Sequence, residues 1–469
     1  MTTRNPEFQR QLWLNWRPSL MVWSLCLSAL ILALPLALAA PDRRAASLGM
    51  TALAGLWLAA VGYGSVLAGR SLREEASQNT WDWQRLSALS PWQMGWGKLL
   101  GAAVPAWLYA LWFALVMLFV SATWPQVARI GGLRLGLHAV ALAALWGLGV
   151  QAWAMNSVLV AWGQQARPAD SRQAQWLPLL LVWMSASLLV RGYAIFTSGK
   201  ASSVLWWGMD IGYLGAAYLS GAFLLALGLL ALWRLLCMRL DVRTLPWAWP
   251  LGLAACGFFT AGAVAGDADL KGAGPDAFAG ATFLFAAAGT VLIALMQMDG
   301  HLRDWRQAQW AASRGRWRQA LQALPLWPVS WLLALAASVA PALWAGKFDQ
   351  TFFLPLICLH LLRDCLILTG FALLAGRLRS PLAVFCIVWA VINIALPLLA
   401  RSVAGPAGAS LAQPVIELAL RGFGAWGIHG IAPWASLGVQ LLLAAGWAGW
   451  IFRDRVLGFA RERGKRAET

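Results

Sequence analysis

The sequence predicts an all-α polytopic membrane protein with about twelve transmembrane helices, arranged as two halves of six, and with both termini in the cytoplasm. Hydrophobic residues make up 60% of the 469 residues and charged residues only 12%, about half of the roughly 25% that a soluble domain carries. The apolar residues fall in stretches near or above the roughly 20 residues that span a bilayer. The basic residues gather on alternate connections between these stretches.

Twelve apolar stretches are predicted as spans from their length and hydropathy. The first half, residues 1–240, holds 20–40, 47–69, 99–123, 135–163, 176–196 and 211–236. The second half, residues 241–469, holds 247–266, 278–298, 325–345, 352–375, 381–400 and 431–452. In each half the longest cytoplasmic loop joins the second and third spans, at residues 70–98 and 299–324. The chain therefore repeats a pattern of spans and loops, although the two loops share little sequence.

The distribution of positive charge predicts the orientation of these spans. Of the 36 Lys and Arg residues, 25 lie on the set of connections that includes both termini, and nine lie on the other set. Cytoplasmic loops carry the excess of Lys and Arg, so both termini are expected in the cytoplasm. The net charge of +17 is explained by this topology and by attraction to anionic lipid headgroups. No nucleic-acid partner is therefore expected.

The loop at residues 70–98 carries the most local information. After Glu74 and Glu75, residues at helical spacings predict an amphipathic helix that ends near Leu89. Ser90-Pro91 should start a new helix that runs into the third span, because Ser is favoured at the N-cap and Pro at the first helical position. A short rigid helix at the membrane surface would transmit a push from a soluble partner. The simpler alternative is an interfacial helix that only anchors the bundle.

This segment resembles the coupling-helix region of permeases of the type-2 ATP-binding-cassette (ABC) exporters. That family typically has a Glu-rich turn, a Gly-Thr pair, a leucine-rich stretch that ends in Ser-Pro, and Gly-Lys-Leu at the start of the next span. The matching residues are Glu74, Glu75, Thr80, Leu86, Leu89, Ser90, Pro91, Gly97, Lys98 and Leu99. Residues 5–18 resemble the amphipathic elbow helix that precedes the first span of the family. Asn79 departs from the family's Gly, and the second loop lacks the Ser-Pro pair.

The resemblance implies that the chain is the permease subunit of an exporter in a bacterial-type cytoplasmic (inner) membrane. ATP would be hydrolysed by two copies of a separate ATP-binding subunit, so this chain would not be an enzyme and would bind no cofactor. Accessory subunits are compatible with this arrangement. The sequence contains no G-x-x-x-x-G-K-[ST] phosphate-binding loop. The residues expected to couple to the ATPase are Glu75, Thr80, Trp81, Arg85, Leu86, Leu89, Ser90, Pro91, Arg303, Arg306 and Arg314. The competing explanation for the basic run of the second loop is that its arginines only mark the loop as cytoplasmic and bind no partner.

Three ionisable residues, His360, Arg363 and Asp364, lie inside the tenth predicted span. A charge at mid-bilayer costs several kcal/mol (about 2.5 to 3.5 on insertion scales) unless it is paired or hydrated. His360 and Asp364 are four residues apart and share a helix face, while Arg363 can pair with Asp364 or with another helix. Two interpretations stay open: a polar site or proton relay, and a structural ion pair. The first permits an alternative function, an ion-coupled secondary transporter. The six Cys residues show no metal-type spacing, so no metal site is predicted.

Overall fold

The computed structural model describes the chain over residues 5–16, 18–78, 80–87, 89–123, 132–164, 180–183, 185–186, 203–240, 242, 244–265, 274–297, 301–345, 353–374, 378, 380–400, 402–403 and 432–457. Within these residues 89% are helical. A two-stranded hairpin is formed by β1 (Leu205–Trp206) and β2 (Met209–Asp210). Trp207 and Gly208 have φ of 52° and 74°, the positive values that a tight two-residue hairpin turn requires.

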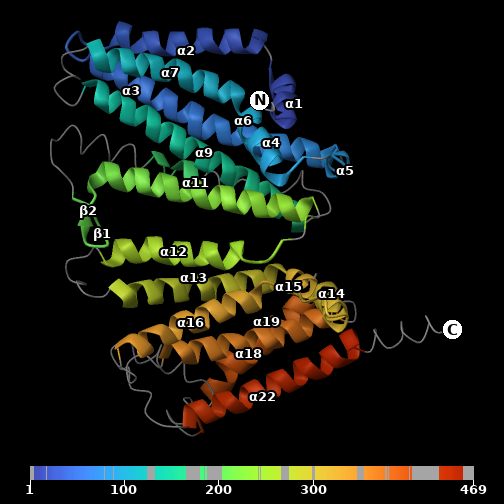
Figure 1. Ribbon diagram of the computed structural model, residues 1–469. Helices are drawn as coiled ribbons and strands as arrows, with labels where there is room; N and C mark the ends of the chain where they lie inside the picture. The colour runs from blue at the N-terminus through green and yellow to red at the C-terminus, as the bar shows by residue number, and fades with distance from the viewer. Residues whose placement is uncertain are drawn as a thin grey trace. The chain divides into compact units, whose positions relative to one another are not determined.

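The chain divides into two compact units, one made of Met1–Leu205 with Met209–Arg243 and the other of Trp206–Gly208 with Thr244–Thr469. The first unit contains α1 (Pro6–Asn15), α2 (Pro18–Leu38), α3 (Arg44–Trp57), the π-helix η1 (Leu58–Tyr63), α4 (Gly64–Ser77), α5 (Trp81–Arg85), α6 (Pro91–Ala102), α7 (Val104–Thr123), α9 (Gly132–Gln164) and α11 (Gly212–Arg239). Figure 1 shows α1, α5 and α6 together at one end of this unit.

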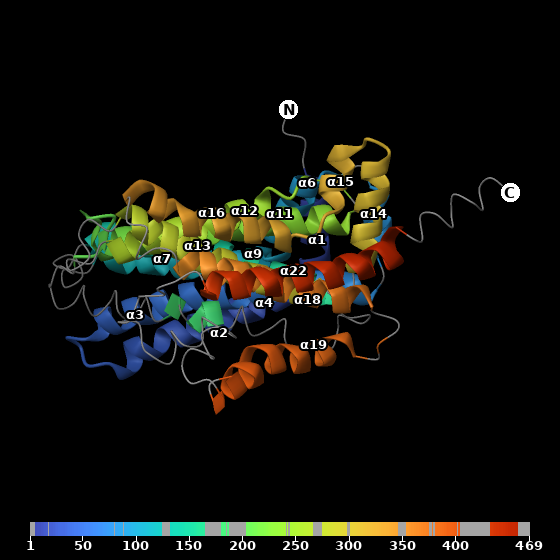
Figure 2. The same cartoon turned by 90° about the horizontal axis from the view of Figure 1, so that it is seen from below.

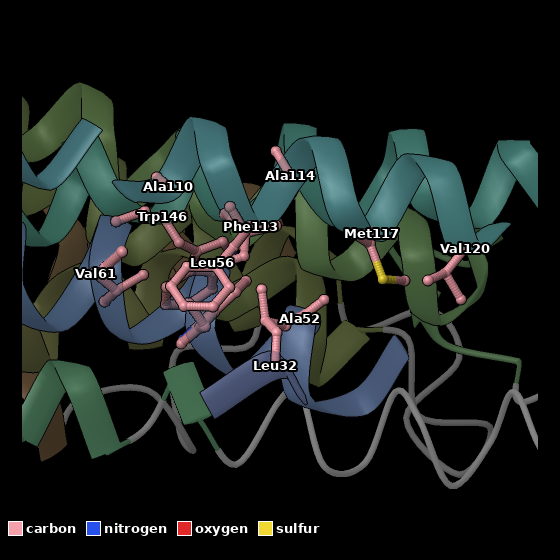
Figure 3. Close-up of a cluster of buried hydrophobic side chains, with 14 of the residues drawn as sticks. Leu32, Ala52, Leu56, Val61, Ala110, Phe113, Ala114, Met117, Val120 and Trp146 are labelled. Carbon is pink, nitrogen blue, oxygen red and sulfur yellow. The ribbon is translucent and has the colours of Figure 1, made fainter. Parts of the chain in front are cut away.

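The core of the first unit is a layer of apolar side chains between α2, α3, η1, α7 and α9. Leu56, Phe113 and Trp146 are buried there (Figure 3). Within the π-helix η1, the carbonyl of Ala60 accepts a hydrogen bond from the side-chain Nε2 of Gln151, at 2.8 Å. A buried amide therefore satisfies the backbone where the long helix changes its winding.

The second unit contains α12 (Ala248–Ala265), α13 (Gly274–Met296), α14 (His301–Ser313), α15 (Trp317–Ala323), α16 (Trp327–Ala345), α18 (Phe353–Leu373), α19 (Pro381–Ala390), the π-helix η4 (Val391–Ala395), α22 (Ala432–Phe452) and the π-helix η5 (Arg453–Leu457). Buried residues of α13, α16 and α18 form its core, among them Phe283, Ala334 and Cys358. Figure 2 shows α14 and α15 at the end of this unit where α22 finishes.

The described residues contain ten helices long and apolar enough to cross a membrane, or eleven if the bent pair α15–α16 counts as one span. The chain is therefore a multi-pass membrane protein. Eleven of the twelve predicted stretches coincide with helices of the described residues. Most of the remaining stretch, residues 176–196, lies outside the described residues.

Candidate functional site

The site begins with α1, the helix that the elbow resemblance predicts. Asn5 caps it, because its side-chain oxygen accepts hydrogen bonds from the backbone N–H groups of Glu7 and Phe8, and Pro6 occupies the first turn. The Asn5 amide also donates to the carbonyl of Gln93 at 2.6 Å. The helix buries Glu7 and Gln11 on one side. Trp13 is exposed on the opposite side, and Leu14 and Trp16 are exposed at the C-terminal end, where apolar side chains can enter a membrane interface.

The Ser90-Pro91 prediction is confirmed for the start of the helix, but the helix does not run unbroken into the third span. Ser90 is the N-cap of α6, and its hydroxyl accepts from the N–H of Gln93 at 3.2 Å. The Gln93 side chain accepts in return from the Ser90 N–H at 3.0 Å, which completes a capping box. A break at Ala103 separates α6 from α7, because Pro105 has no N–H to continue the helical ladder.

The preceding helix is shorter than predicted. It was expected to end near Leu89, but α5 ends at Arg85. Ser87 caps a turn there, with its N–H and its hydroxyl both donating to the carbonyl of Gln84. The apolar side therefore splits: Trp81 is buried, Leu89 packs against the same core cluster, and Leu86 is 81% exposed. The sequence pattern placed all three on one face, which only a longer helix would produce.

Two glycines bring α1 and α6 into backbone contact. Gly97 and Gly101 are four residues apart and face the elbow helix. A Cβ at Gly97 would lie 2.7 Å from the Glu7 Cβ and 2.8 Å from the Phe8 nitrogen. A Cβ at Gly101 would lie 2.7 Å from the Gln11 Cβ. Only glycine permits this approach, which is the small-xxx-small mode of helix packing in membranes.

Across this contact lies a buried charge cluster formed by Glu7, Arg10, Gln11, Glu75 and Lys98. Lys98 is 0% exposed, and its Nζ donates to Glu7 Oε1 at 2.8 Å and to Glu75 Oε1 and Oε2 at 2.7 and 2.5 Å. Arg10 bonds both carboxylates, and the Gln11 amide donates to both at 3.0 Å. Two acids and two bases balance, so the cluster buries no net charge.

The electrostatics of Glu7 follow from these contacts. Burial alone would raise its pKa, but the hydrogen bond from Arg10 and the charge of Lys98 outweigh burial and lower the pKa to about 2. Burial alone would lower the pKa of Arg10, but its bonds to the two carboxylates raise it. Both groups stay ionised, so α1, the end of α4 and α6 are tied together by charge-assisted hydrogen bonds.

A second set of contacts joins α5 to α11. Trp81 Nε1 and Arg85 Nε both donate to the carbonyl of Arg239, at 3.2 and 2.9 Å, and Arg239 Nη2 donates to the carbonyl of Leu159 at 2.8 Å. Lys98 also lies 5.6 Å from the centroid of the Trp81 ring. Thr80 donates through its backbone N–H to the Glu75 carbonyl at 3.2 Å, which closes the turn between α4 and α5. Of the predicted residues of the first loop, Glu75 and Trp81 thus contact Lys98, whereas Leu86 is exposed.

The second loop places its predicted arginines differently. Arg306 donates through Nε and Nη2 to the carbonyl of Arg455, at 3.0 and 2.7 Å, and so holds α14 against η5. Arg303 is exposed, and Arg314 stacks on Trp310. On the same helix, burial raises the pKa of Asp304 to about 6, although the charge of Arg303 opposes the shift. The three arginines do not converge on one site.

Inside the tenth predicted span, Arg363 and Asp364 pair, at 2.9 and 2.7 Å from Nε and Nη2 to Oδ1. Sequence reasoning missed two further partners of Arg363, Asn393 on η4 at 2.5 Å and Gln440 on α22. Trp389 Nε1 donates to the other Asp364 oxygen at 2.9 Å. His360 is buried, and neither ring nitrogen has a hydrogen-bond partner among the described residues. All three guanidinium nitrogens therefore have hydrogen-bond partners, and His360 is not one of them.

Sequence reasoning also missed Glu7, Arg10 and Gln11. The available signal was their spacing of three and four residues on an elbow helix that is otherwise apolar on its exposed side. Each hydrogen bond from these residues to Glu75 or Lys98 spans 64 or more residues of sequence.

Comparisons of the chain with protein-family models, with curated proteins and with solved structures found no match.

Proposed function

We propose that this chain is the transmembrane permease of an ABC exporter in a bacterial-type cytoplasmic membrane. It forms the substrate pathway and couples to a separate ATP-hydrolysing subunit, present in two copies, one for each cytoplasmic loop. The observation that carries the proposal is the buried charge cluster. It makes α6, which starts at the capped Ser90-Pro91 pair, a rigid body with α1 and the end of α4.

Rigidity is what a coupling device requires. A push on α5 and α6 is lost if those helices yield locally, because interfaces transmit motion only when they move as units. Here Lys98 joins α6 to α1 and α4, and Trp81 and Arg85 join α5 to α11. ATP binding would close the ATPase subunits, displace this rigid body and open the substrate pathway.

The surface offered to the ATPase is centred on Leu86. Its apolar side chain is 81% exposed beside a rigid helix, so it is available to pack against a partner. Leu89 packs into the core cluster, so it supports the segment rather than binding a partner. The Arg85 side chain donates a hydrogen bond to the Arg239 carbonyl, so it holds α5 against α11.

The test replaces Leu86 with Asp in the full chain. We expect loss of the co-purifying nucleotide-hydrolysing subunit, because a charge at the centre of an apolar contact is left desolvated and unpaired. The matched control is Leu38→Asp at the C-terminal end of α2, since Leu38 is also 81% exposed and lies at the end of α2 that the proposed topology places outside. The proposal fails if the Leu86→Asp protein keeps its partner and transports normally, or if the unaltered chain retains no such partner.

The alternative, an ion-coupled secondary transporter, is favoured by the polar group in α18. The Asp364 side chain stays 21% exposed, and His360 is buried with no hydrogen bond to any residue that the structure describes. Asp364→Asn would then abolish proton-coupled uptake in vesicles that contain the chain alone. Uptake that needs ATP and a second subunit, and that survives this substitution, rejects the alternative.

A further inference from the structure

The turn between α14 and α15 concentrates positive charge on one tryptophan. The guanidinium of Arg314 lies 4.1 Å from the centroid of the Trp310 ring, and that of Arg316 lies 5.9 Å from it. Gly315 has φ of +69°, a conformation that ordinary side chains rarely adopt. The turn is closed by the Gly315 and Arg316 N–H groups, which donate to the carbonyls of Ala312 and Ala311. Because the chain reverses at this turn, the positive guanidinium groups of Arg314 and Arg316 both lie near the Trp310 ring.

These charges are not balanced by acids. Arg314, Arg316 and Arg318 are exposed, and no ion pair to them occurs within the part of the chain that the structure describes. The helix α15 contains no Asp or Glu, and α14 contains only Asp304 in its first turn. We call Trp310, Arg314, Arg316, Trp317 and Arg318 the turn patch. It presents three positive charges and two indole rings.

The position of the turn patch relative to the bilayer follows from α16. The axes of α15 and α16 differ by 89°, and three residues, 324–326, connect them. If α16 crosses the membrane, α15 runs along the membrane surface within about 10 Å of the start of that span. Trp317 is 67% exposed and Leu321, one turn later, is also exposed. Arginine with tryptophan at this depth is the chemistry of the lipid headgroup layer.

We propose that the turn patch binds the headgroups of anionic phospholipids. The arginines contact the phosphates, and Trp317 with Leu321 enters the interface beside them. The turn patch lies in the second cytoplasmic loop, to which the proposed function also assigns an ATPase copy, so lipid binding is measured on the chain without that partner. An acidic protein surface would also suit the charge, but it would not require an exposed Trp and Leu on a helix that lies along the membrane plane next to a span.

The test uses the full chain in detergent and measures by native mass spectrometry how phosphatidylglycerol binds relative to phosphatidylcholine. In the triple variant Arg314→Gln, Arg316→Gln, Arg318→Gln the preference for phosphatidylglycerol should fall by about 5-fold per arginine, since each basic residue near an anionic surface contributes about 1 kcal/mol. The corresponding triple Lys variant should retain most of the preference. In nanodiscs, phosphatidylglycerol should slow amide exchange in residues 313–323 of the unaltered chain but not of the Gln variant.

A matched control removes the same charge elsewhere, at the exposed residues Arg43, Arg44 and Arg134. Its preference for phosphatidylglycerol should change less than 3-fold. Equal losses in the control and the turn-patch variant would overturn the proposal, because they would show a response to net charge only. It is also overturned if millimolar inorganic phosphate displaces the lipid, or if the Gln variant keeps its lipid preference and instead loses an acidic protein partner.

Discussion

Lys98 is the residue on which the buried charge cluster depends most. It is 0% exposed and donates three hydrogen bonds of 2.5 to 2.8 Å to Glu7 and Glu75, whose side chains are 3% and 7% exposed. Replacing it with Met keeps the length and the apolar stem but leaves two carboxylates next to each other with Arg10 as their only cationic partner in the cluster. Removing one member of a buried ion pair costs about 3–5 kcal/mol, because the remaining charge stays desolvated.

The cost should appear as undocking of α1 from α6. A loss of about 3 kcal/mol corresponds to more than a hundred-fold increase in the open population. Hydrogen exchange of the α1 amides, measured by mass spectrometry on the full chain in detergent, reports that population directly. We expect exchange in α1 to accelerate by about that factor. Exchange in α18, which belongs to the other compact unit, should change little.

Two further variants make this prediction refutable. Adding Glu7→Gln and Glu75→Gln to Lys98→Met removes the stranded charges, so the triple variant should recover most of the protection. Arg70→Met breaks only the Arg70–Glu74 pair, whose side chains are 64% and 51% exposed, and should cost less than about 1 kcal/mol. If Lys98→Met changes α1 exchange no more than Arg70→Met does, or if the triple variant is worse than the single one, the reasoning is wrong.

The remaining predictions concern acid, packing and capping. The pKa of Glu7 is lowered to about 2, so its contribution is complete above its ordinary pKa of about 4.5 and is lost as the pH falls from there towards 2; exchange in α1 should therefore accelerate below about pH 4.5. The pKa of Asp304 is raised to about 6, so α14 should become more protected as the pH falls through 6, and Asp304→Asn should remove that dependence. Gly97→Ala should undock α1, because the new Cβ meets Phe8 backbone at 2.8 Å, whereas Gly252→Ala, with nothing within 4 Å, should not; disulfide trapping of α1 against α6 measures the difference. Ser90→Ala should lower the stability of the first turn of α6 by about 1 kcal/mol in the same exchange experiment, and unchanged protection there would contradict the capping role.

Much of the fold follows from local pattern. Eleven of the twelve predicted stretches coincide with helices, because a run of about 20 apolar residues has no stable alternative in a bilayer to a helix that satisfies its own backbone. The start of α6 was equally predictable, since the Ser90 cap and the fixed φ of Pro91 act within one turn. The end of α5 was not, because the turn at Ser87 depends on a competition between side-chain and backbone hydrogen bonds that periodicity does not register.

The polar contacts also separate into those that local sequence predicts and those that it does not. The pairing of Arg363 with Asp364 was one of two predicted options, because neighbouring charges in a span must be neutralised nearby. Asn393 and Gln440 are 30 and 77 residues from Arg363 in sequence, and nothing local to them marks them as its partners. Of the predicted arginines in the second loop, Arg306 donates to the Arg455 carbonyl and Arg314 stacks on Trp310.

The sequence by itself determined that this chain crosses a membrane many times, where most of its helices lie, and that a capped helix begins at Ser90-Pro91. Those properties depend on hydropathy and on interactions within a few residues. Only the tertiary structure decided that Glu7 and Glu75 share Lys98 across the Gly97 contact. A buried ion pair forms wherever packing brings its members together and excludes water, and that is a property of the folded arrangement rather than of any one segment.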